Sequence, residues 1–380
     1  MTFSLNVNAT KFRGHLVSVM NTYATAGAEL VPVIKGNGYG FGRGLLASEA
    51  ARLGSNRIAI GTVWELGQSL ADFAGEILVL EPFNSSDTSA VSQWRAHLEH
   101  NADRIIVTVS NVDLAAVRAA GAKNIYLEGK TSLSRFGILH LDMQSIENFN
   151  DLKVQGLSLH LPIVQPAIKV DATTEISSAF NGATLSKSMT ETWNWVVLYQ
   201  ELATKFALPK HLSLSHITES QLKSLKKMMH SYNFDMEIEV RVGTKLWLGE
   251  PSALQATGTV LQIHELMNSR TVGYQQTNSG NNKRLIVVSG GTAHGVAMAA
   301  PSTASSLRKK GVAIAEGFSQ AIGKVRSPFS FKGKNLDFVE PPHMQVSMLW
   351  SNDMKIAVGD NLNCNVRNTT SNFDCVLGLD

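Results

Sequence analysis

A lysine at the end of an apolar run is the first residue in this chain that could do chemistry. Residues 31–35 read Val-Pro-Val-Ile-Lys, and glycine takes alternate positions around Tyr39 up to residue 42. A lysine that is partly removed from water loses proton affinity, so its amine becomes usable as a base or as a nucleophile toward a carbonyl group. Glycines let the backbone approach a ligand closely. An exposed lysine in a glycine-rich turn is the alternative, and the stretch lacks the Gly-Lys-Ser/Thr ending of a Walker-type phosphate loop.

The elements that must position Lys35 follow a regular alternation over the first two thirds of the chain. Amphipathic segments, such as residues 44–54, 64–75, 111–121 and 190–206, separate strand-like runs that are apolar almost throughout, as expected for a parallel sheet covered on both faces. About eight such units predict an α/β fold with a closed (β/α)8 TIM-type barrel. An open doubly wound sheet is the competing arrangement, and the lack of an obvious midpoint switch favours closure. The predicted strands cover residues 29–35, 56–63, 76–82, 104–110, 123–129, 154–161, 211–217 and 236–243.

The pattern changes at about Leu246, where short strand-like runs are separated by Gly, Asn and Asp turns rather than by helices. We therefore expect a barrel domain over residues 10–245 and a mostly β domain over residues 246–380 together with residues 1–9. The segment 161–186 is long and polar and has no periodicity. In a barrel it would lie on the face that carries the site, where long loops are commonly functional.

The composition limits the possible partners and compartment. The chain has 380 residues, of which 44% are hydrophobic and 17% are charged, and its formal net charge is +3. No Lys/Arg cluster is dense enough to indicate a nucleic-acid partner. Only two cysteines occur, which indicates a reducing compartment. The N-terminal residues lack the features of a signal peptide, and no apolar run has the length of about 18 residues that spans a membrane. We expect a cytoplasmic protein without a membrane partner.

Segments distributed over nearly the whole chain resemble the alanine racemase family. The stretch VPVIKGNGYGFG resembles the family's strand that ends in V-K-A-N-A-Y-G-H-G, whose lysine carries pyridoxal 5'-phosphate (PLP). Similar segments follow in the family's order: YLEGKTSLSRFGI, VQGLSLHL and VRVGTKLWLGE, and then TVGYQQT, VVSGGTAHG, PPHMQVSML and AVGDNLNC. Each motif is weak, and their collinearity carries the resemblance. It implies a PLP-dependent amino-acid racemase with alanine as the default substrate, built as a head-to-tail homodimer.

The resemblance also implies which residues of the barrel domain hold PLP. Lys35 would bind the cofactor and act as the base on one face of the substrate α-carbon. A guanidinium keeps its proton, so an arginine at the pyridine nitrogen favours proton exchange over transamination. Ser213 is the local alternative to Ser215 as a phosphate ligand. The implied contacts are Tyr39, Ser215, Gly243 and Thr244 at the phosphate, Arg241 at the pyridine nitrogen, His160 beside the ring, and Arg135 at the phenolic oxygen or the substrate carboxylate.

A racemase needs a second acid–base group on the opposite face of the α-carbon. The resemblance implies that this group is Tyr274, contributed by the partner subunit. A phenol titrates near pH 10, so it needs nearby positive charge or hydrogen bonds, for which a relay from Arg241 through His160 is plausible. A strand tyrosine packed at an interface is the alternative for this residue. The backbone of Met344 would help to bind the substrate carboxylate.

Departures from the family pattern concentrate at the substrate entrance. Glu128 stands where the family has a carbamylated lysine, and it would supply a fixed negative charge near Arg135. A rebuilt entrance would suit another small amino acid, such as serine. The other departures include Lys130, Thr292, His294, Gln345 and Phe373.

Three other function classes compete with a racemase. A PLP-binding regulatory or cofactor-carrying protein could use the same fold, but its single-barrel relatives lack the β domain and the second base. A fold-related PLP decarboxylase would need a glycine triplet for the phosphate and a cysteine-containing acidic motif, and neither occurs. An inactive barrel would have no need of the combined set of Lys35, Tyr39, Arg135, His160, Arg241 and Tyr274, and this set favours the racemase.

Overall fold

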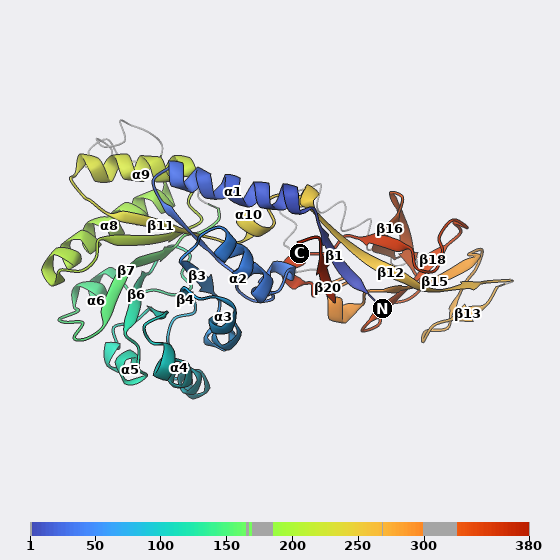
Figure 1. Ribbon diagram of the computed structural model, residues 1–380, viewed down its shortest axis with the longest axis horizontal. Coiled ribbons are helices and arrows are strands. Elements are labelled where there is room, and N and C mark those ends of the chain that lie inside the picture. Colours follow the sequence, from blue (N-terminus) through green and yellow to red (C-terminus); the bar gives the residue numbers. More distant parts are fainter. Residues whose placement is uncertain (1, 165–166, 169–184, 268, 299–324, 380) are drawn as a thin grey trace. The chain divides into compact units, whose positions relative to one another are not determined.

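The computed structural model of the chain describes residues 2–164, 167–168, 185–267, 269–298 and 325–379 (Figure 1). The chain divides into two compact units. The barrel unit comprises Gly14–Gly36 and Arg43–Gly249, and the β unit comprises Met1–Arg13, Asn37–Gly42 and Glu250–Asp380. The glycine-rich segment around Tyr39 thus groups with the β unit, whereas the predicted domain bounds place it in the barrel.

The barrel unit contains eight parallel strands in one sheet, in the order β2-β11-β10-β7-β6-β5-β4-β3. The two end strands are joined by a parallel bridge between Val33 and Ala59, where the Ile34 amide donates to the Ala59 carbonyl at 2.8 Å. The sheet is therefore closed, and the predicted (β/α)8 barrel is confirmed. The strands are β2 (Glu29–Pro32), β3 (Arg57–Ile60), β4 (Glu76–Val79), β5 (Ile105–Val109), β6 (Asn124–Gly129), β7 (Lys153–His160), β10 (His211–Ser215) and β11 (Glu237–Val242).

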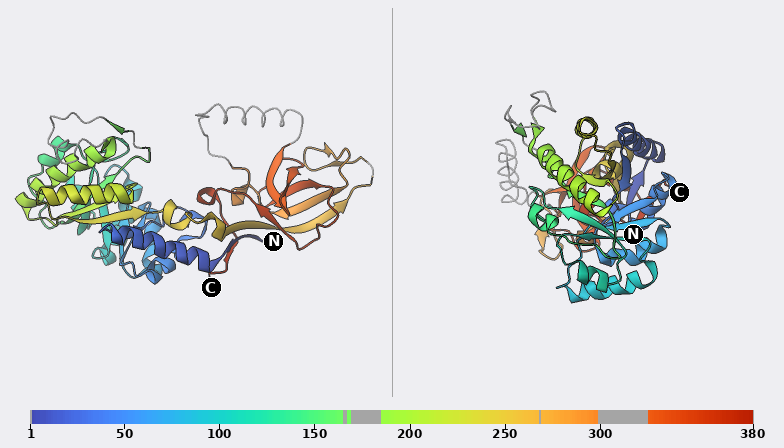
Figure 2. Two further views of the ribbon diagram at one scale, coloured as in Figure 1. Left: turned by 90° about the horizontal axis from the view of Figure 1, so that it is seen from above. Right: turned by 90° about the vertical axis from the view of Figure 1, so that its left-hand side faces the viewer.

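Amphipathic helices surround these strands, and α8 and α9 lie side by side on the outside (Figures 1 and 2). Side-chain caps begin several helices: Asp87 accepts from the Ala90 amide at 3.0 Å, and Thr218 forms a capping box with Gln221. The helices are α1 (Ala9–Thr25), α2 (Arg43–Arg52), α3 (Leu66–Asp72), α4 (Thr88–Asn101), α5 (Leu114–Ala119), α6 (His140–Gln144), α8 (Lys187–Phe206), α9 (Glu219–Ser231) and α10 (Thr244–Trp247).

A buried ion pair lies among the amino-terminal ends of the barrel strands. Arg57 Nη1 is 2.5 Å from Glu239 Oε2, and Arg57 Nη2 is 2.7 Å from Glu76 Oε2. Tyr126 Oη accepts from Arg57 Nη1 at 3.0 Å and lies 3.1 Å from His211 Nδ1. Burial alone would lower the pKa of Arg57, but Glu239, Tyr126 and Glu76 together outweigh it and raise that pKa. This network closes one end of the barrel, opposite the end that carries Lys35.

Most of the segment 161–186 lies outside the described residues. Its described parts include two short strands, β8 (Ala167–Ile168) and β9 (Leu185–Ser186), which pair antiparallel. Among the described helices, none combines the length and the apolar character needed to cross a membrane.

The β unit contains a closed antiparallel barrel, which confirms the predicted second, mostly β domain. Its sheet has the order β15-β18-β17-β16-β19-β12-β1-β20, and an additional β12–β15 pairing closes it. β12 pairs with β19 along its first half and with β15 along its second, and a bulge between Val260 and Gln262 interrupts its pairing with β15. The strands are β1 (Phe3–Val7), β12 (Leu254–Glu265), β15 (Arg284–Ser289), β16 (Arg326–Phe331), β17 (Lys334–Phe338), β18 (Val346–Ser351), β19 (Asn361–Cys364) and β20 (Cys375–Leu377).

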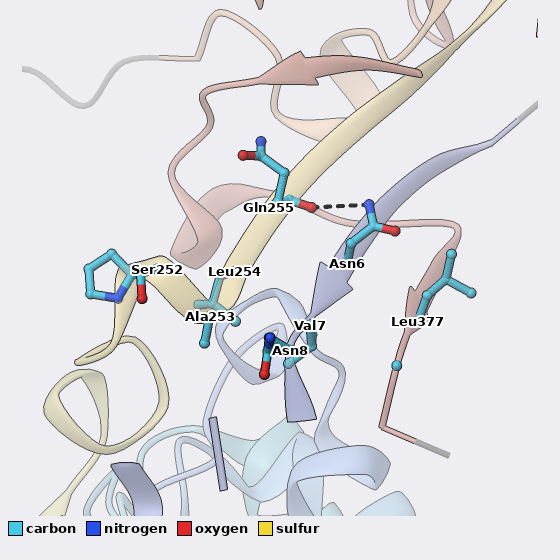
Figure 3. Close-up of a pocket in the computed structure, with 10 residues that line it drawn as sticks. Asn6, Val7, Asn8, Ser252, Ala253, Leu254, Gln255 and Leu377 are labelled. Carbon is cyan, nitrogen blue, oxygen red and sulfur yellow. Dashed lines mark hydrogen bonds between the residues drawn. The ribbon is translucent and has the colours of Figure 1, made fainter. Parts of the chain in front are cut away.

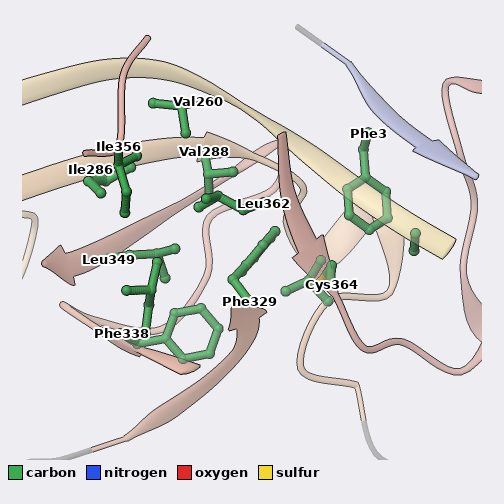
Figure 4. Close-up of a cluster of buried hydrophobic side chains, with 13 residues drawn as sticks. Phe3, Val260, Ile286, Val288, Phe329, Phe338, Leu349, Ile356, Leu362 and Cys364 are labelled. Atoms are coloured by element: carbon green, nitrogen blue, oxygen red, sulfur yellow. The ribbon is translucent and has the colours of Figure 1, made fainter. Parts of the chain in front are cut away.

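The core of the β unit lies inside this barrel, where side chains of several strands meet (Figure 4). Phe3, Phe329 and Leu349 are each 0% exposed. A Cβ added at Gly258 would lie 2.2 Å from the Ser289 carbonyl oxygen, so β12 and β15 can approach only because this residue is glycine. A separate open groove runs along β1, β12 and β20, where Asn6 Nδ2 donates to the Gln255 carbonyl at 3.2 Å (Figure 3). No predicted site residue lines this groove.

The run 269–277 is one of the strand-like runs predicted after Leu246, but the structure differs from that prediction. Instead of one strand it contains β13 (Thr271–Val272) and β14 (Thr277–Asn278), which pair antiparallel on either side of a turn. Gly273 has φ +76° and Gln276 has φ +50°, and such backbone angles are incompatible with a continuous strand. Tyr274 is therefore a turn residue.

Candidate functional site

Lys35 stands at the carboxyl end of the first barrel strand, held by contacts of the neighbouring backbone. Glu65 accepts hydrogen bonds from the amides of Gly36, at 3.0 Å, and Gly61, at 2.8 Å. One carboxylate thereby fastens the chain after β2 to the chain after β3. A Cβ added at Gly61 would lie 3.2 Å from Lys35 Cβ, so the lysine packs directly over this glycine. These contacts fix where the Lys35 side chain starts.

The surroundings of Lys35 favour its unprotonated form. Partial removal from water lowers the pKa of the Lys35 amine, and the charges of Arg135 and Arg241 lower it further, while Glu65 opposes them. The side chain nevertheless remains accessible from solvent. An accessible amine with a lowered pKa is what a general base or a carbonyl-binding nucleophile requires.

Arg241, at the end of β11, presents a buried donor toward the same mouth. The residue is 6% exposed, and its Nη2 donates to the Leu159 carbonyl at 2.8 Å. Its Nε has no hydrogen-bond partner among the described residues. A buried unpaired donor costs on the order of 1–3 kcal/mol, so this nitrogen is suited to an acceptor on a bound molecule.

Two histidines meet beside Lys35. The rings of His160, at the end of β7, and His216 lie edge to face with centroids 5.2 Å apart. Burial lowers the pKa of His160 to about 3, with contributions from Arg241 and Arg135, so its imidazole is neutral at physiological pH. Burial and the charge of Lys35 also lower the pKa of His216. The mouth thus holds two neutral imidazoles among cations.

The sequence reasoning missed His216. It directly follows the predicted ligand Ser215, and it adopts φ +56°, a left-handed conformation that is uncommon for residues other than glycine. A histidine next to a predicted ligand at a strand end was the available signal.

Strand register separates the two candidate serines. Ser215 is in register with His160 and Arg241, at the level of the mouth. Ser213 is in register with Ser158 and Glu239, one step deeper in the barrel. Both hydroxyls are buried without a partner among the described residues. The register makes Ser215 the better placed of the two.

The remaining barrel residues of the predicted site also lie at the carboxyl ends of strands. Glu128, at the end of β6, is 4% exposed, and burial raises its pKa while Arg241 and Arg135 oppose that rise. Arg135 is exposed in the loop after β6. Gly243 caps α10, and Thr244 is its first residue and is exposed. The barrel unit therefore brings together Lys35, Arg135, His160, Ser215, Arg241, Gly243 and Thr244.

Three predicted site residues belong to the β unit instead. Tyr39 is buried in a 3-10 turn and has φ +54°. Tyr274 is 86% exposed, and Met344 is 67% exposed. The Met344 carbonyl accepts from the Ala293 amide at 3.0 Å. Thr292 is exposed in the neighbouring 3-10 turn.

Two of the residues predicted at the entrance have packing contacts in the β unit. His294 is 8% exposed, its Nδ1 accepts from the Gly291 amide at 3.2 Å, and its Nε2 lies 3.3 Å from Asp374 Oδ1. The centroid of the His294 ring is 5.2 Å from that of Phe3. On the Phe3 ring, Phe373 stacks with a centroid distance of 5.2 Å. These contacts attach the carboxyl-terminal segment to β1. Lys130, in contrast, is exposed at the end of β6.

Comparison with known proteins gives a consistent family. Residues 7–244 match the family model described as alanine racemase, N-terminal domain. No curated protein matches the chain. Solved structures resemble it at low identity. Alanine racemase of Clostridium difficile 630 is 16% identical with a TM-score of 0.63, over 96% of this chain and 87% of that one.

Two further alanine racemases are similar. That of the D-cycloserine producer Streptomyces lavendulae is 17% identical with a TM-score of 0.60, over 97% of this chain and 88% of that one. That of Bartonella henselae, solved with covalently bound pyridoxal phosphate, is 16% identical with a TM-score of 0.56, over 96% and 90%. At these identities the structural likeness shows a shared fold. Since the family model covers more than half of the sequence, the chain belongs to the alanine racemase N-terminal domain family.

Proposed function

We propose that this protein is a PLP-dependent amino-acid racemase that uses two bases, Lys35 and Tyr274, with alanine as the default substrate. The observation that carries the proposal is the arrangement at the barrel mouth. Lys35, whose pKa is lowered, shares this mouth with a buried arginine whose Nε has no partner among the described residues. A structural lysine would need neither feature.

The residues present fit PLP. Arg241 Nε and Ser215 Oγ are buried polar atoms without partners among the described residues, and acceptors and donors on a bound molecule would satisfy them. Lys35, Arg135 and Arg241 supply positive charge for a phosphate-bearing anion. In this proposal Arg241 would hold the pyridine nitrogen, and Lys35 would hold the aldehyde carbon until the substrate amine displaces it, which frees the Lys35 amine to act as a base. Ser215, Tyr39 and the amides of Gly243 and Thr244 hold the phosphate.

When bound, PLP draws electrons from the substrate α-carbon and so acidifies its proton. Residues of this chain then remove and return that proton. Lys35 removes or returns it on one face, because its amine is accessible and has a lowered pKa. Arg241 keeps its own proton, so it donates to the pyridine nitrogen without protonating it. His160 is neutral and lies beside these groups.

The second face requires a group from the β unit. Tyr274 is proposed to act there from the partner subunit of a head-to-tail homodimer, with the Met344 backbone and Arg135 holding the substrate carboxylate. The exposure of Tyr274, at 86%, leaves its phenol accessible to a second molecule, as this proposal needs. Serine is the second candidate substrate, because Lys130 and Thr292 change the charge and size of the predicted entrance.

Exchange of the α-proton in D2O tests the proposal. The protein with added PLP is incubated with L-alanine and, separately, with L-serine, followed by NMR and chiral analysis. We expect deuterium at the α-carbon together with the D-enantiomer, and borohydride reduction should fix PLP on Lys35 but not on a Lys35→Ala variant. Trapped PLP without exchange of any amino acid would overturn the racemase and leave a cofactor-binding protein. The absence of trapped PLP would overturn the cofactor assignment as well.

A further inference from the structure

The turn that carries Tyr274 is fastened to one buried carboxylate. Glu340 is 6% exposed, its Oε1 accepts from the Tyr274 amide at 3.1 Å, and its Oε2 accepts from the Gln275 amide at 3.0 Å. Burial alone would raise the pKa of Glu340, but these hydrogen bonds and that from His343 outweigh it and lower the pKa. The carboxylate is therefore ionised at neutral pH and binds two consecutive amides of the turn.

The same contact constrains the residue before Tyr274. Gly273 has φ +76°, and a Cβ added there would lie 2.5 Å from the Glu340 carboxylate. Glycine is required at this position both for its backbone angle and for the space that the carboxylate occupies. Gly273 and Glu340 thus form one unit with the turn.

His343 connects this carboxylate to the Tyr274 ring. His343 Nε2 lies 2.8 Å from Glu340 Oε1, and the rings of His343 and Tyr274 have centroids 4.7 Å apart with a tilt of 39°. The remainder of the Tyr274 side chain faces solvent, since 86% of the residue is exposed. The backbone of Tyr274 is thus held firmly while its ring stays available.

We propose that Glu340 and His343 are positioning residues for Tyr274: Glu340 fixes the turn, and His343 fixes the direction of the ring toward a second copy of this chain. This inference rests on the proposed role of Tyr274 as the second base. In this proposal neither residue contacts substrate or cofactor. Their effect on the reaction would come from the placement of the phenol, where an error of 1 Å costs on the order of a hundredfold in rate.

The test separates proton exchange from inversion. The enantiomer whose α-proton Lys35 removes can take up deuterium from Lys35 and keep its configuration, whereas inversion also needs Tyr274. In Glu340→Gln, an amide replaces one acceptor oxygen, so at least one of the three donors loses its bond. We expect inversion to fall on the order of a hundredfold. Exchange with retention should continue, as in the reference variant Tyr274→Phe. His343→Ala should likewise raise the ratio of α-proton exchange to inversion.

A matched control shows whether any loosened turn in the β unit has this effect. Asp360 Oδ2 accepts from the Ala357 amide at 2.9 Å in another turn, so Asp360→Ala removes a side chain–amide contact away from Tyr274. We expect an unchanged ratio of exchange to inversion. Hydrogen exchange of the amides of Tyr274 and Gln275 should speed up in Glu340→Gln and stay unchanged in Asp360→Ala.

The outcomes separate this inference from the proposed function. If Tyr274→Phe leaves inversion intact, the second base itself is overturned. If Tyr274→Phe splits exchange from inversion but Glu340→Gln lowers both equally, or changes neither, the positioning role is overturned and the proposed function stands. The same split in both variants, with faster amide exchange in Glu340→Gln, supports the inference.

Discussion

At the scale of single residues, the barrel mouth is a site of concentrated positive charge. Lys35, Arg135 and Arg241 act on one another, and the charges of the two arginines lower the pKa of the lysine. The two neutral histidines add donors and acceptors without adding charge. A mouth of this kind favours an anion over a neutral or cationic molecule.

Removing one of these cations should change how Lys35 reacts with PLP. Arg135→Gln takes away a positive charge, so we expect the Lys35 pKa to rise. Because only the unprotonated amine attacks the aldehyde, the pH profile of PLP attachment, followed by absorbance, should move to higher pH. Lys130→Gln is the matched control, because Lys130 is an exposed cation nearby in sequence and is not among the charges that shift the Lys35 pKa. A profile unchanged by Arg135→Gln, or moved equally by both variants, would contradict the expectation.

Sequence could predict the residues at strand ends better than those in turns. Lys35, His160, Ser215 and Arg241 end apolar runs, and the carboxyl ends of parallel strands in a barrel lie on one face. His216 was not predicted, and the turn around Tyr274 depends on the φ angles of Gly273 and Gln276, which the motif does not encode. The turn around Tyr274 further depends on Glu340, which is distant in the sequence.

At the scale of elements, the two barrels differed in how well their strands could be predicted. The strands of the parallel barrel are buried on both faces and read as apolar runs, whereas β16 and β17 read as polar and contain Pro328 and Asn335. Their pairing is irregular, with a register shift between Arg326 and Ser330. Such strands are fixed by their neighbours in the sheet more than by their own residue pattern.

The ion pair at the closed end of the parallel barrel should support its stability. Glu239 is 0% exposed, so Arg57→Met would leave a buried carboxylate without its cation. We expect the free energy of unfolding in urea to fall by about 3–5 kcal/mol. The double variant Arg57→Met/Glu239→Leu should recover most of this loss, because it removes the charge as well. A loss below about 1 kcal/mol in the single variant would show that the pair has little importance.

At the scale of the whole molecule, the barrel unit is inserted within the sequence of the β unit. Lys35 belongs to the inserted unit, and Tyr274 belongs to the unit that surrounds it in the sequence. Under the proposed function each site would combine Lys35 of one chain with Tyr274 of another. A single chain would then contribute half of each of two sites.

Mixed variants should therefore restore activity. Lys35→Ala and Tyr274→Phe should each be inactive in racemisation alone, while their heterodimer should contain one intact site and one site that lacks both groups. After unfolding and refolding together, a 1:1 mixture should show about one quarter of wild-type activity for randomly assorted dimers. Mixing without subunit exchange is the control. No recovery after demonstrated exchange would mean that the two residues do not meet across a dimer.

The pairing of β1 has a consequence for how the chain is made. Phe3 lies in register with Gly258, and Ser4 with Cys375, so β1, which precedes the barrel unit in the sequence, joins two strands that follow it. At usual rates of translation, the interval between the synthesis of β1 and that of β12 and β20 is on the order of half a minute. Phe3 and Leu5 therefore leave the ribosome before β12 and β20 exist to pair with their strand. We expect the β1 segment to need protection during this interval, and a chain that terminates before β12 should aggregate rather than form a shortened but folded β unit.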